Sequence, residues 1–195
     1  MSSDVAVVIL AGGEGRRIGG DKPLLELAGE RLIDRALRNA RRWSAPIAVA
    51  ARDSSQVEPI TVPVIADQRD IEGPVAGLLS ALRFTAELRC RHVLTIPADM
   101  PFLPADMFGR LRKQIGDLGC AMASSNGHVH PVCALWRASA LDRAGEYLAS
   151  SRRSLRGFAE LVGYVPVDWP AEPFDPFFNI NTAEDLAEAE RRVAN

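Results

Sequence analysis

The residues best suited to chemistry lie in a glycine-rich segment near the N-terminus. An apolar run, 5–10, leads directly into the sequence AGGEGRRIGGDK, in which five glycines accompany two arginines and a lysine. Glycines let backbone N–H groups turn toward a ligand at close range, and the cations supply the charge that a polyphosphate needs. The segment therefore predicts a strand followed by a phosphate-binding loop, with a nucleotide as its ligand.

The loop departs from the two best-known nucleotide-binding patterns. The Walker pattern places lysine directly after glycine, but here Asp21 separates Lys22 from the last glycine. The dinucleotide pattern G-x-G-x-x-G begins at Gly13 and then meets Ile18 where the third glycine is required. An ordinary strand-to-helix turn would account for the glycines alone. Such a turn would not account for the presence of Arg17 and Lys22 at their spacing from the glycines.

Asp99 is the strongest acidic candidate. It follows the apolar run 93–96 and lies between Pro97 and Pro101, which restrict the backbone around it. Mg²⁺ binds a few carboxylates together with waters and phosphate oxygens, so one such acid near a triphosphate can suffice. An aspartate here can also close a turn or begin a helix. Both interpretations are open from the residues alone.

A third group of candidates lies in the last quarter of the chain. Asn179 and Asn181 are two residues apart, so their amides face one way if the segment is extended. They could grip a polar ring or complete a metal shell, although asparagine before a helix is also an ordinary cap. Upstream, Arg152, Arg153 and Arg156 could attract a phosphate or form a solvated helix face.

Two further motifs are less specific. His128 and His130 are two apart and could form a metal pair, but no third ligand lies nearby in the sequence, which favours a structural or solvated pair in a turn. The segment Gly73-Pro74-Val75-Ala76-Gly77 taken alone is a helix start with proline in its first turn.

The elements that must position these residues alternate between strand and helix. Helical patterns at 32–43 and 75–88 each carry an apolar face. This alternation predicts an α/β fold, a Rossmann-like three-layer α/β/α sandwich with a mainly parallel sheet. Ligands of such sheets bind at the carboxyl ends of the strands, where we expect the loop, Asp67 and Asp99. Runs typical of buried strands, the last three weaker, are 5–10, 47–51, 62–66, 93–96, 120–123, 132–136 and 164–167.

Two local features complete this outline. The proline-rich segment 166–176 is expected to cross the surface as a loop. Thr182 and Asp185 have the spacing of a capping box ahead of a final helix.

The composition excludes several classes of protein. The chain has 195 residues, 47% apolar and 25% charged, with a net charge of -2, which is typical of one globular domain and gives no field suited to nucleic acid. Its three cysteines include no C-x-x-C pair, so we expect buried thiols rather than disulfides or a zinc site. No segment approaches the ~20 apolar residues of a membrane span, and the N-terminus lacks a basic, apolar leader, so we expect a cytoplasmic protein with no membrane contact.

The order of these motifs along the chain resembles that of the molybdenum cofactor guanylyltransferases, within the nucleotidyltransferase superfamily. The resemblance implies the nucleotide-diphospho-sugar transferase type of fold in a single domain, 1–195, with about 1–100 binding nucleotide and about 101–195 binding the acceptor. The matching motifs are Leu10-Ala11-Gly12-Gly13 with Arg17 and Lys22, Gly73-Pro74-Val75-Ala76-Gly77, Pro97-Ala98-Asp99-Met100-Pro101, His130-Pro131-Val132, Arg152-Arg153, and F-x-N-x-N-T at 177–182.

The resemblance also implies an activity and its residues. GMP would pass from Mg-GTP to the terminal phosphate of molybdopterin, with release of pyrophosphate and no covalent enzyme intermediate. Catalysis would fall to Arg17, Lys22 and Asp99, with Mg²⁺ on Asp99. Nucleotide binding would fall to Leu10, Ala11, Gly12, Gly13, Lys22, Asp67, Gly73, Pro74, Gly77 and Asp99. Acceptor binding would fall to Arg153, Asn179, Asn181 and His130.

Three alternatives stay open from the sequence. Leu-Ala-Gly-Gly favours guanine over cytosine, but Ala50, Ala51 and Arg52 stand where relatives often have asparagine, so no base-reading residue is transferred. A cytidylyltransferase and a sugar-phosphate nucleotidyltransferase of the same fold are therefore alternatives, as is a nucleotide-binding regulator without catalysis. Besides GTP and molybdopterin, the resemblance is compatible with transient contact with other molybdenum cofactor biosynthesis proteins and molybdoenzyme chaperones.

Overall fold

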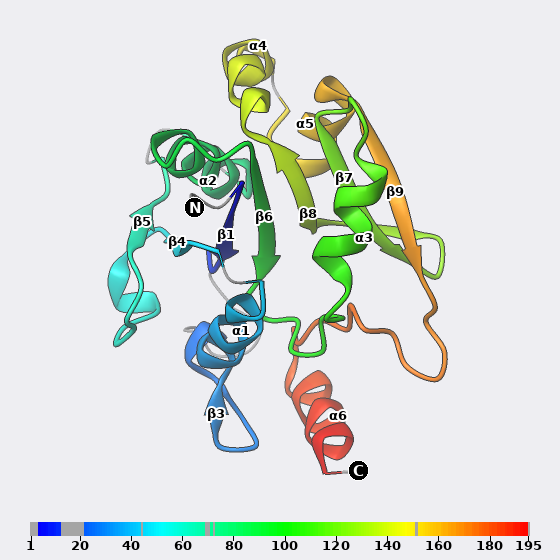
Figure 1. Cartoon of the computed structure of the whole chain (residues 1–195). Coiled ribbons are helices and arrows are strands. Elements are labelled where there is room, and N and C mark those ends of the chain that lie inside the picture. The colour runs from blue at the N-terminus through cyan, green and yellow to red at the C-terminus, as the bar shows by residue number, and fades with distance from the viewer. Residues whose placement is uncertain are drawn as a thin grey trace.

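The structure is a computed structural model that describes residues 4–12, 22–43, 45–68, 71, 73–150 and 152–194. A seven-stranded sheet runs through its centre (Figure 1). The strands of this sheet are β1 (Val5–Leu10), β4 (Ile47–Ala51), β5 (Val64–Ala66), β6 (His92–Pro97), β7 (Cys120–Ser125), β8 (His128–Arg137) and β9 (Tyr164–Trp169). The described α-helices are α1 (Leu32–Arg41), α2 (Val75–Glu87), α3 (Met107–Gln114), α4 (Ala144–Ala149), α5 (Leu155–Val162) and α6 (Ala183–Val193).

The sheet has the order β5-β4-β1-β6-β8-β7-β9. Every neighbouring pair is parallel except the two pairs that include β8, which is antiparallel to β6 and to β7. The carboxyl ends of β5, β4, β1 and β6 therefore lie side by side at one edge of the sheet. A two-stranded hairpin of β2 (Glu26–Leu27) and β3 (Glu30–Arg31) precedes α1.

Both faces of the sheet are covered, which explains why β1 is apolar throughout. Val7 and Ile9 join one core cluster with the apolar faces of α1 and α3, whereas Val8 joins a second cluster with α2 and α5. All three of these β1 side chains are fully buried. In a third, smaller cluster α6 packs against β2 and α1 through residues such as Leu27 and Ala189.

The observed elements confirm the predicted α/β fold with its mainly parallel sheet. The capping box at Thr182 and Asp185 is present, and the three cysteines are free and buried. Within the described residues, no helix combines the length and apolarity needed to cross a membrane.

Several boundary predictions were wrong. β5 begins at Val64, two residues later than predicted. The segment 166–169 is not a loop but the last four of the six residues of β9, which pairs only with β7 and is thus an edge strand, where proline is tolerated. Leu88 lies beyond the end of α2 and is 36% exposed, so it does not contribute to the buried face of the helix.

Candidate functional site

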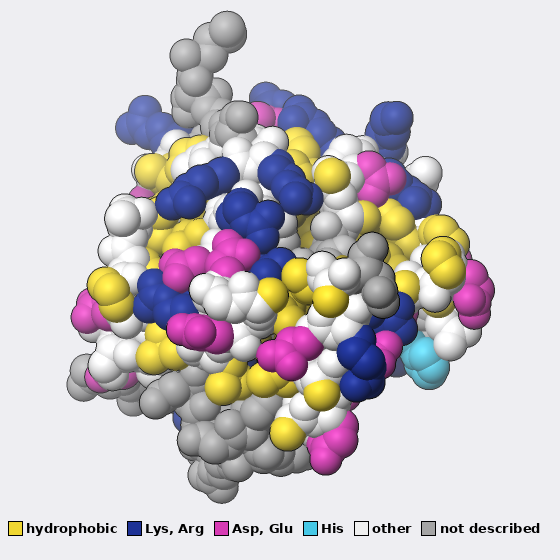
Figure 2. Space-filling model, turned by 90° about the horizontal axis from the view of Figure 1, so that it is seen from below, with side chains coloured by type: hydrophobic (Ala, Val, Ile, Leu, Met, Phe, Trp, Pro, Cys, Tyr) yellow, Lys and Arg dark blue, Asp and Glu magenta, His cyan; other side chains and the backbone are white. Residues whose placement is uncertain are grey.

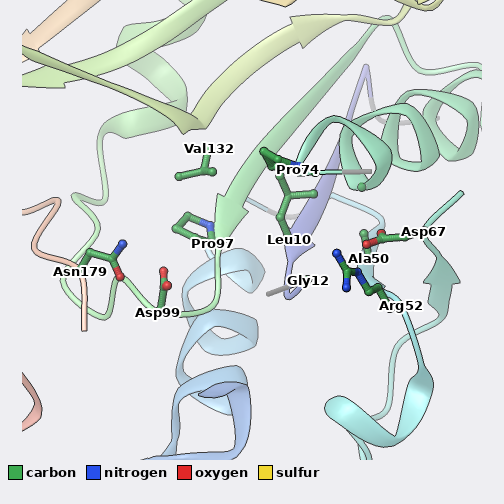
Figure 3. Close-up of a pocket in the computed structure, with 12 residues that line it drawn as sticks. Leu10, Gly12, Ala50, Arg52, Asp67, Pro74, Pro97, Asp99, Val132 and Asn179 are labelled. Carbon is green, nitrogen blue, oxygen red and sulfur yellow. The ribbon is translucent and has the colours of Figure 1, made fainter. Parts of the chain in front are cut away.

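A pocket of about 260 Å³ opens at the carboxyl edge of the sheet, between the ends of the parallel strands and the start of α2 (Figure 3). Seen from below, this side of the molecule presents basic and acidic side chains interspersed with one another (Figure 2). The pocket is therefore a localised site rather than part of a broad field of one sign. The residues predicted for the site that line it are Leu10, Gly12, Asp67, Gly73, Pro74, Gly77, Asp99 and Asn179.

Lys22 and Asp99 meet at one end of this site. Lys22 Nζ lies 2.5 Å from Asp99 Oδ2, 2.8 Å from Asn181 Oδ1 and 3.4 Å from Asn179 Oδ1. The lysine and aspartate side chains are 14% and 21% exposed, so they form a largely buried ion pair. An ammonium group has three N–H donors, and here each faces an oxygen atom. The prediction that the two asparagine amides face one way is confirmed.

The backbone holds this cluster together from three separate parts of the chain. Lys22 begins the short 3₁₀ turn η2 (Lys22–Leu24), and Asp99 lies in the turn after β6, two residues beyond the end of that strand at Pro97. The Ile180 amide donates to the Asp99 carbonyl at 3.0 Å, so the asparagine segment is attached beside the aspartate. Downstream, the Asn181 amide donates to the Asp185 carboxylate of the α6 capping box at 2.8 Å.

The second oxygen of Asp99 fits a cation. Asp99 Oδ1 is buried and has no hydrogen-bond partner among the described residues. Among the described residues, no group of three or more His, Cys, Asp or Glu side chains is arranged so that it could hold a metal ion. A single carboxylate with amide oxygens nearby is a donor set that suits Mg²⁺ when phosphates and waters supply its other ligands.

Asp67 forms the opposite end of the pocket, where Figure 3 places it beside Arg52. Two glycines make room for its carboxylate: a Cβ on Gly12 would lie 2.9 Å from Asp67 Oδ2, and one on Gly77 would lie 3.2 Å from Oδ1. Burial raises the pKa of the Asp67 carboxyl above its usual value, and the Arg52 guanidinium partly offsets that increase. Asp67 Oδ1 is also buried without a hydrogen-bond partner among the described residues.

Arg153 lies behind the pocket wall rather than in it. A Cβ on Gly73 would meet the Arg153 carbonyl at 3.1 Å, and Gly73 has φ +81°, so both sterics and backbone conformation call for glycine there. The Arg153 guanidinium donates to the carbonyls of Ser150 and Arg152 at 2.6 and 2.7 Å. Arg152 and Arg156 both form ion pairs with Glu160, whereas Arg153 does not share this partner. The three arginines therefore do not form one group.

The remaining predicted residues have other positions. His130 lies on β8, and the turn before it is at Asn126 and Gly127, so the expectation of a histidine pair in a turn was wrong. Its ring does not line the pocket. The Ala11 side chain is buried in the core. Gly13 and Arg17 lie outside the described residues.

Sequence reasoning missed four residues that line the pocket: Ala50, Arg52, Pro97 and Val132. A signal was available for Arg52, because it directly follows β4, and polar residues at the carboxyl ends of parallel strands are candidates for ligand contact. The other three are apolar, and nothing in their type separates them from core residues.

Comparison with known proteins gives a consistent result. Residues 7–163 match the family model described as the MobA-like NTP transferase domain. The chain is 42% identical over 194 residues to a molybdenum cofactor guanylyltransferase of Rhodopseudomonas palustris strain BisB5, covering 94% of this chain and 91% of that protein. It is 37% identical over 195 residues to the protein of the same name from Bradyrhizobium sp. strain ORS 278, covering 96% and 92%.

Solved structures show the same similarity. Molybdopterin-guanine dinucleotide biosynthesis protein A from Archaeoglobus fulgidus superposes with a TM-score of 0.77 at 27% identity, covering 97% of this chain and 98% of that one. The 4-diphosphocytidyl-2C-methyl-D-erythritol synthase of Anaerococcus prevotii superposes with a TM-score of 0.76 at 13% identity, covering 100% and 97%. The second likeness shows a shared fold only.

Proposed function

The chain belongs to the family of MobA-like NTP transferases, and from this premise we propose that it transfers GMP from GTP to molybdopterin, releasing pyrophosphate and forming molybdopterin guanine dinucleotide. It is a nucleotidyltransferase. The observation that carries the substrate assignment to this chain is the Lys22–Asp99 pair beside a pocket that ends at Asp67. A cation and an acid at one end and a nucleoside-sized space at the other suit a nucleoside triphosphate.

The two ends of the pocket define how GTP would lie. Guanosine would occupy the end at Asp67 and Arg52, and the phosphates would extend past Gly12 and the start of α2 toward Lys22. The N-terminus of α2, a helix of 13 residues, adds a positive partial charge along this path. The Arg52 fork can donate to guanine O6 and N7, a pairing that cytosine lacks. These features support GTP over CTP.

Lys22 would act by neutralising phosphate charge. Its longest contact is the 3.4 Å approach to Asn179, so a phosphate oxygen can take that position without disturbing Asp99 or Asn181. In the reaction an oxygen of the acceptor phosphate bonds to the α-phosphorus while the bond to the β-phosphate oxygen breaks. The acceptor oxygen is already anionic at neutral pH, since the second pKa of a phosphate monoester is about 6. Positioning and charge stabilisation therefore suffice, without a general base.

Asp99, with Asn181 beside it, would hold Mg²⁺ through the carboxylate oxygen that has no hydrogen-bond partner among the described residues. When bound, the ion would neutralise charge on the phosphates of GTP. Asn179 and Asn181 would present amides to the pterin from the part of the chain after residue 100. Arg153, whose backbone lies against Gly73, would add a cation for the acceptor. The division into a nucleotide half and an acceptor half stays a prediction, as do the cytoplasmic location and contacts with other biosynthesis proteins.

The test is pyrophosphate release from GTP on addition of molybdopterin and Mg²⁺, with product identified by mass. Thermal shift with each of the four triphosphates and Mg²⁺ identifies the base, because a ligand of the native state raises its stability. Protection by CTP but not GTP would assign the cytidylyl reaction instead. Transfer to a sugar phosphate but not to molybdopterin would contradict the acceptor. GTP binding without pyrophosphate release would indicate a regulator, and an unchanged rate in Asp99→Ala would remove Asp99 from the mechanism.

A further inference from the structure

Three side chains outside the pocket form a continuous hydrogen-bonded chain. Ser125 Oγ lies 2.7 Å from His130 Nε2 and 2.9 Å from Asp175 Oδ2. The three residues come from β7, from β8 and from the segment between β9 and α6, respectively. We refer to Ser125, His130 and Asp175 as the relay.

The chemistry of the groups fixes the direction of these hydrogen bonds. A carboxylate only accepts, so the single hydroxyl proton of Ser125 is donated to Asp175. The hydroxyl oxygen is then left as an acceptor for His130, whose Nε2 must carry a proton. The order is therefore His130 Nε2–H to Ser125 Oγ–H to Asp175. Ser125 is 1% exposed and both partners bind its oxygen, so this is not the nucleophile–base order of a hydrolase triad.

The relay fixes the start of the segment that carries the two asparagines. Asp175 uses both carboxylate oxygens: Oδ2 binds Ser125, and Oδ1 accepts the Phe177 amide at 2.8 Å. The Phe177 ring stacks on the His130 ring with centroids 4.7 Å apart, and it packs edge-on to Trp169 at 5.4 Å. Phe177 is 2% exposed, so this contact is part of the core.

The other end of the same segment is fixed at the site itself. The Ile180 amide donates to the Asp99 carbonyl, and the Asn181 amide donates to Asp185. Asn179 lies between the end fixed at residues 175–177 and the end fixed at residues 180–181, and it lines the pocket. The position of the amides against Lys22 thus depends on where the relay holds residues 175–177.

We propose that Ser125, His130 and Asp175 are positioning residues, which hold Asn179 and Asn181 in place against Lys22 and Asp99 without touching substrate themselves. This inference rests on the proposed function, because its effect is read in transfer to the acceptor. Displacement of reacting groups by about 1 Å can cost about 10²-fold in rate even when the change is remote. His130, for which the family resemblance implied acceptor binding, acts in this proposal through Phe177 and Asp175 instead.

The primary test compares Ser125→Ala with Ser124→Ala. Ser124 is the adjacent residue on β7, and its hydroxyl also donates to a carboxylate, that of Asp168 at 3.0 Å, but on β9 rather than on the asparagine segment. We expect Ser125→Ala to lower kcat/KM for molybdopterin about tenfold, while the Kd for Mg-GTP rises by a smaller factor. Ser124→Ala is expected to leave both values unchanged. Equal losses in the two variants would overturn the proposal.

A double-mutant cycle separates positioning from general stability. If the relay acts through the amides, Ser125→Ala should cost less than about twofold when Asn181→Ala is already present. Full additivity of the two substitutions would overturn the proposal. His130→Gln keeps an N–H donor and should retain more activity than His130→Leu; equal activities would count against the hydrogen-bond order given above.

Amide hydrogen exchange gives a readout that does not require activity. Ser125→Ala should accelerate exchange at Phe177 and Ile180 relative to Ser124→Ala, and unchanged exchange there would overturn the proposal. If the unmodified protein shows no transfer to molybdopterin, the proposed function fails, and the exchange rates alone then decide whether the relay positions the segment.

Discussion

Lys22 Nζ lies 2.5 Å from Asp99 Oδ2, although the two residues are 77 positions apart in the chain. The contact joins the turn that begins at Lys22 to the turn that follows β6. Both side chains are mostly buried, so each charge depends on the other for compensation. The pair therefore prepares a phosphate-binding cation and a metal-binding acid at one point before any ligand arrives.

Replacing Lys22 tests the role of this cation. We expect Lys22→Ala to lower kcat/KM for GTP about 10²- to 10³-fold, because one charge-stabilising donor is lost at the reacting phosphates. The assay is pyrophosphate release under steady-state conditions. The chain contains only one other lysine, Lys113, which is exposed on α3. Lys113→Ala is therefore the matched control, and a comparable loss in both variants would contradict a specific role for Lys22.

The two lysines also allow a direct measurement of occupancy. Lys22 is held by three oxygen atoms, so acetylation should modify it more slowly than Lys113, and Mg-GTP should slow it further. Mass spectrometry of the two peptides measures both rates in one sample. Acetylation of Lys22 that does not respond to Mg-GTP would show that the triphosphate does not reach this side chain.

Gly12→Ala tests the close approach of the loop to Asp67. The added Cβ would lie 2.9 Å from Asp67 Oδ2, a distance that forces the carboxylate to move. We expect the Kd for GTP to rise about tenfold, which corresponds to about 1.4 kcal/mol. Gly109→Ala on α3 is the control, because a Cβ there meets nothing within 4 Å. Calorimetric titration of both variants with Mg-GTP gives the comparison, and unaltered affinity in Gly12→Ala would exclude Asp67 from nucleotide binding.

The raised pKa of Asp67 predicts a pH-dependent difference in stability. Burial favours the protonated carboxyl in the folded state, so the folded protein binds more protons than the unfolded chain over this range. The free energy of unfolding should therefore fall as pH rises from the unfolded pKa, about 3.9, through the higher folded value. In Asp67→Asn this loss disappears, so the variant should be more stable than the unmodified protein near neutral pH but not in acid. Urea unfolding at several pH values measures the difference; a gap that does not depend on pH would contradict it.

The sequence predicted the parts of this structure that depend on local patterns. The apolar run at β1 indicated a strand, because a strand that is buried on both faces must be apolar along its whole length. The spacing of Thr182 and Asp185 indicated the start of a helix, because the two residues form a capping box within its first turn. Asn179 and Asn181 could be paired because an extended backbone places alternate side chains on one side.

The parts that could not be predicted depend on contacts across the fold. The link between Ser125 and Asp175 requires the register of β7 and β8 and the path of the segment after β9, none of which is a local property. Pro97 and Val132 line the pocket, yet their residue types are those of the core. Asp99 was ambiguous between a turn and a metal ligand, and only its buried oxygen, which no described residue hydrogen-bonds, favours the metal.

Arg52 provides the test of base selection. It lines the pocket beside Asp67, at the end away from Asp99, and its guanidinium partly offsets the rise that burial causes in the pKa of the Asp67 carboxyl. If it donates to guanine O6 and N7, Arg52→Ala should raise the Kd for GTP about tenfold or more, since such a bidentate pair is worth about 1–3 kcal/mol of discrimination. Binding of CTP should change much less, so the ratio of the two affinities is the measurement that counts. Arg52→Lys keeps the charge but loses the fork, and it should retain triphosphate binding while losing part of the preference for guanine. A parallel loss of GTP and CTP binding in Arg52→Ala would mean that the residue serves the phosphates or the pocket wall, and the base would then have to be selected elsewhere.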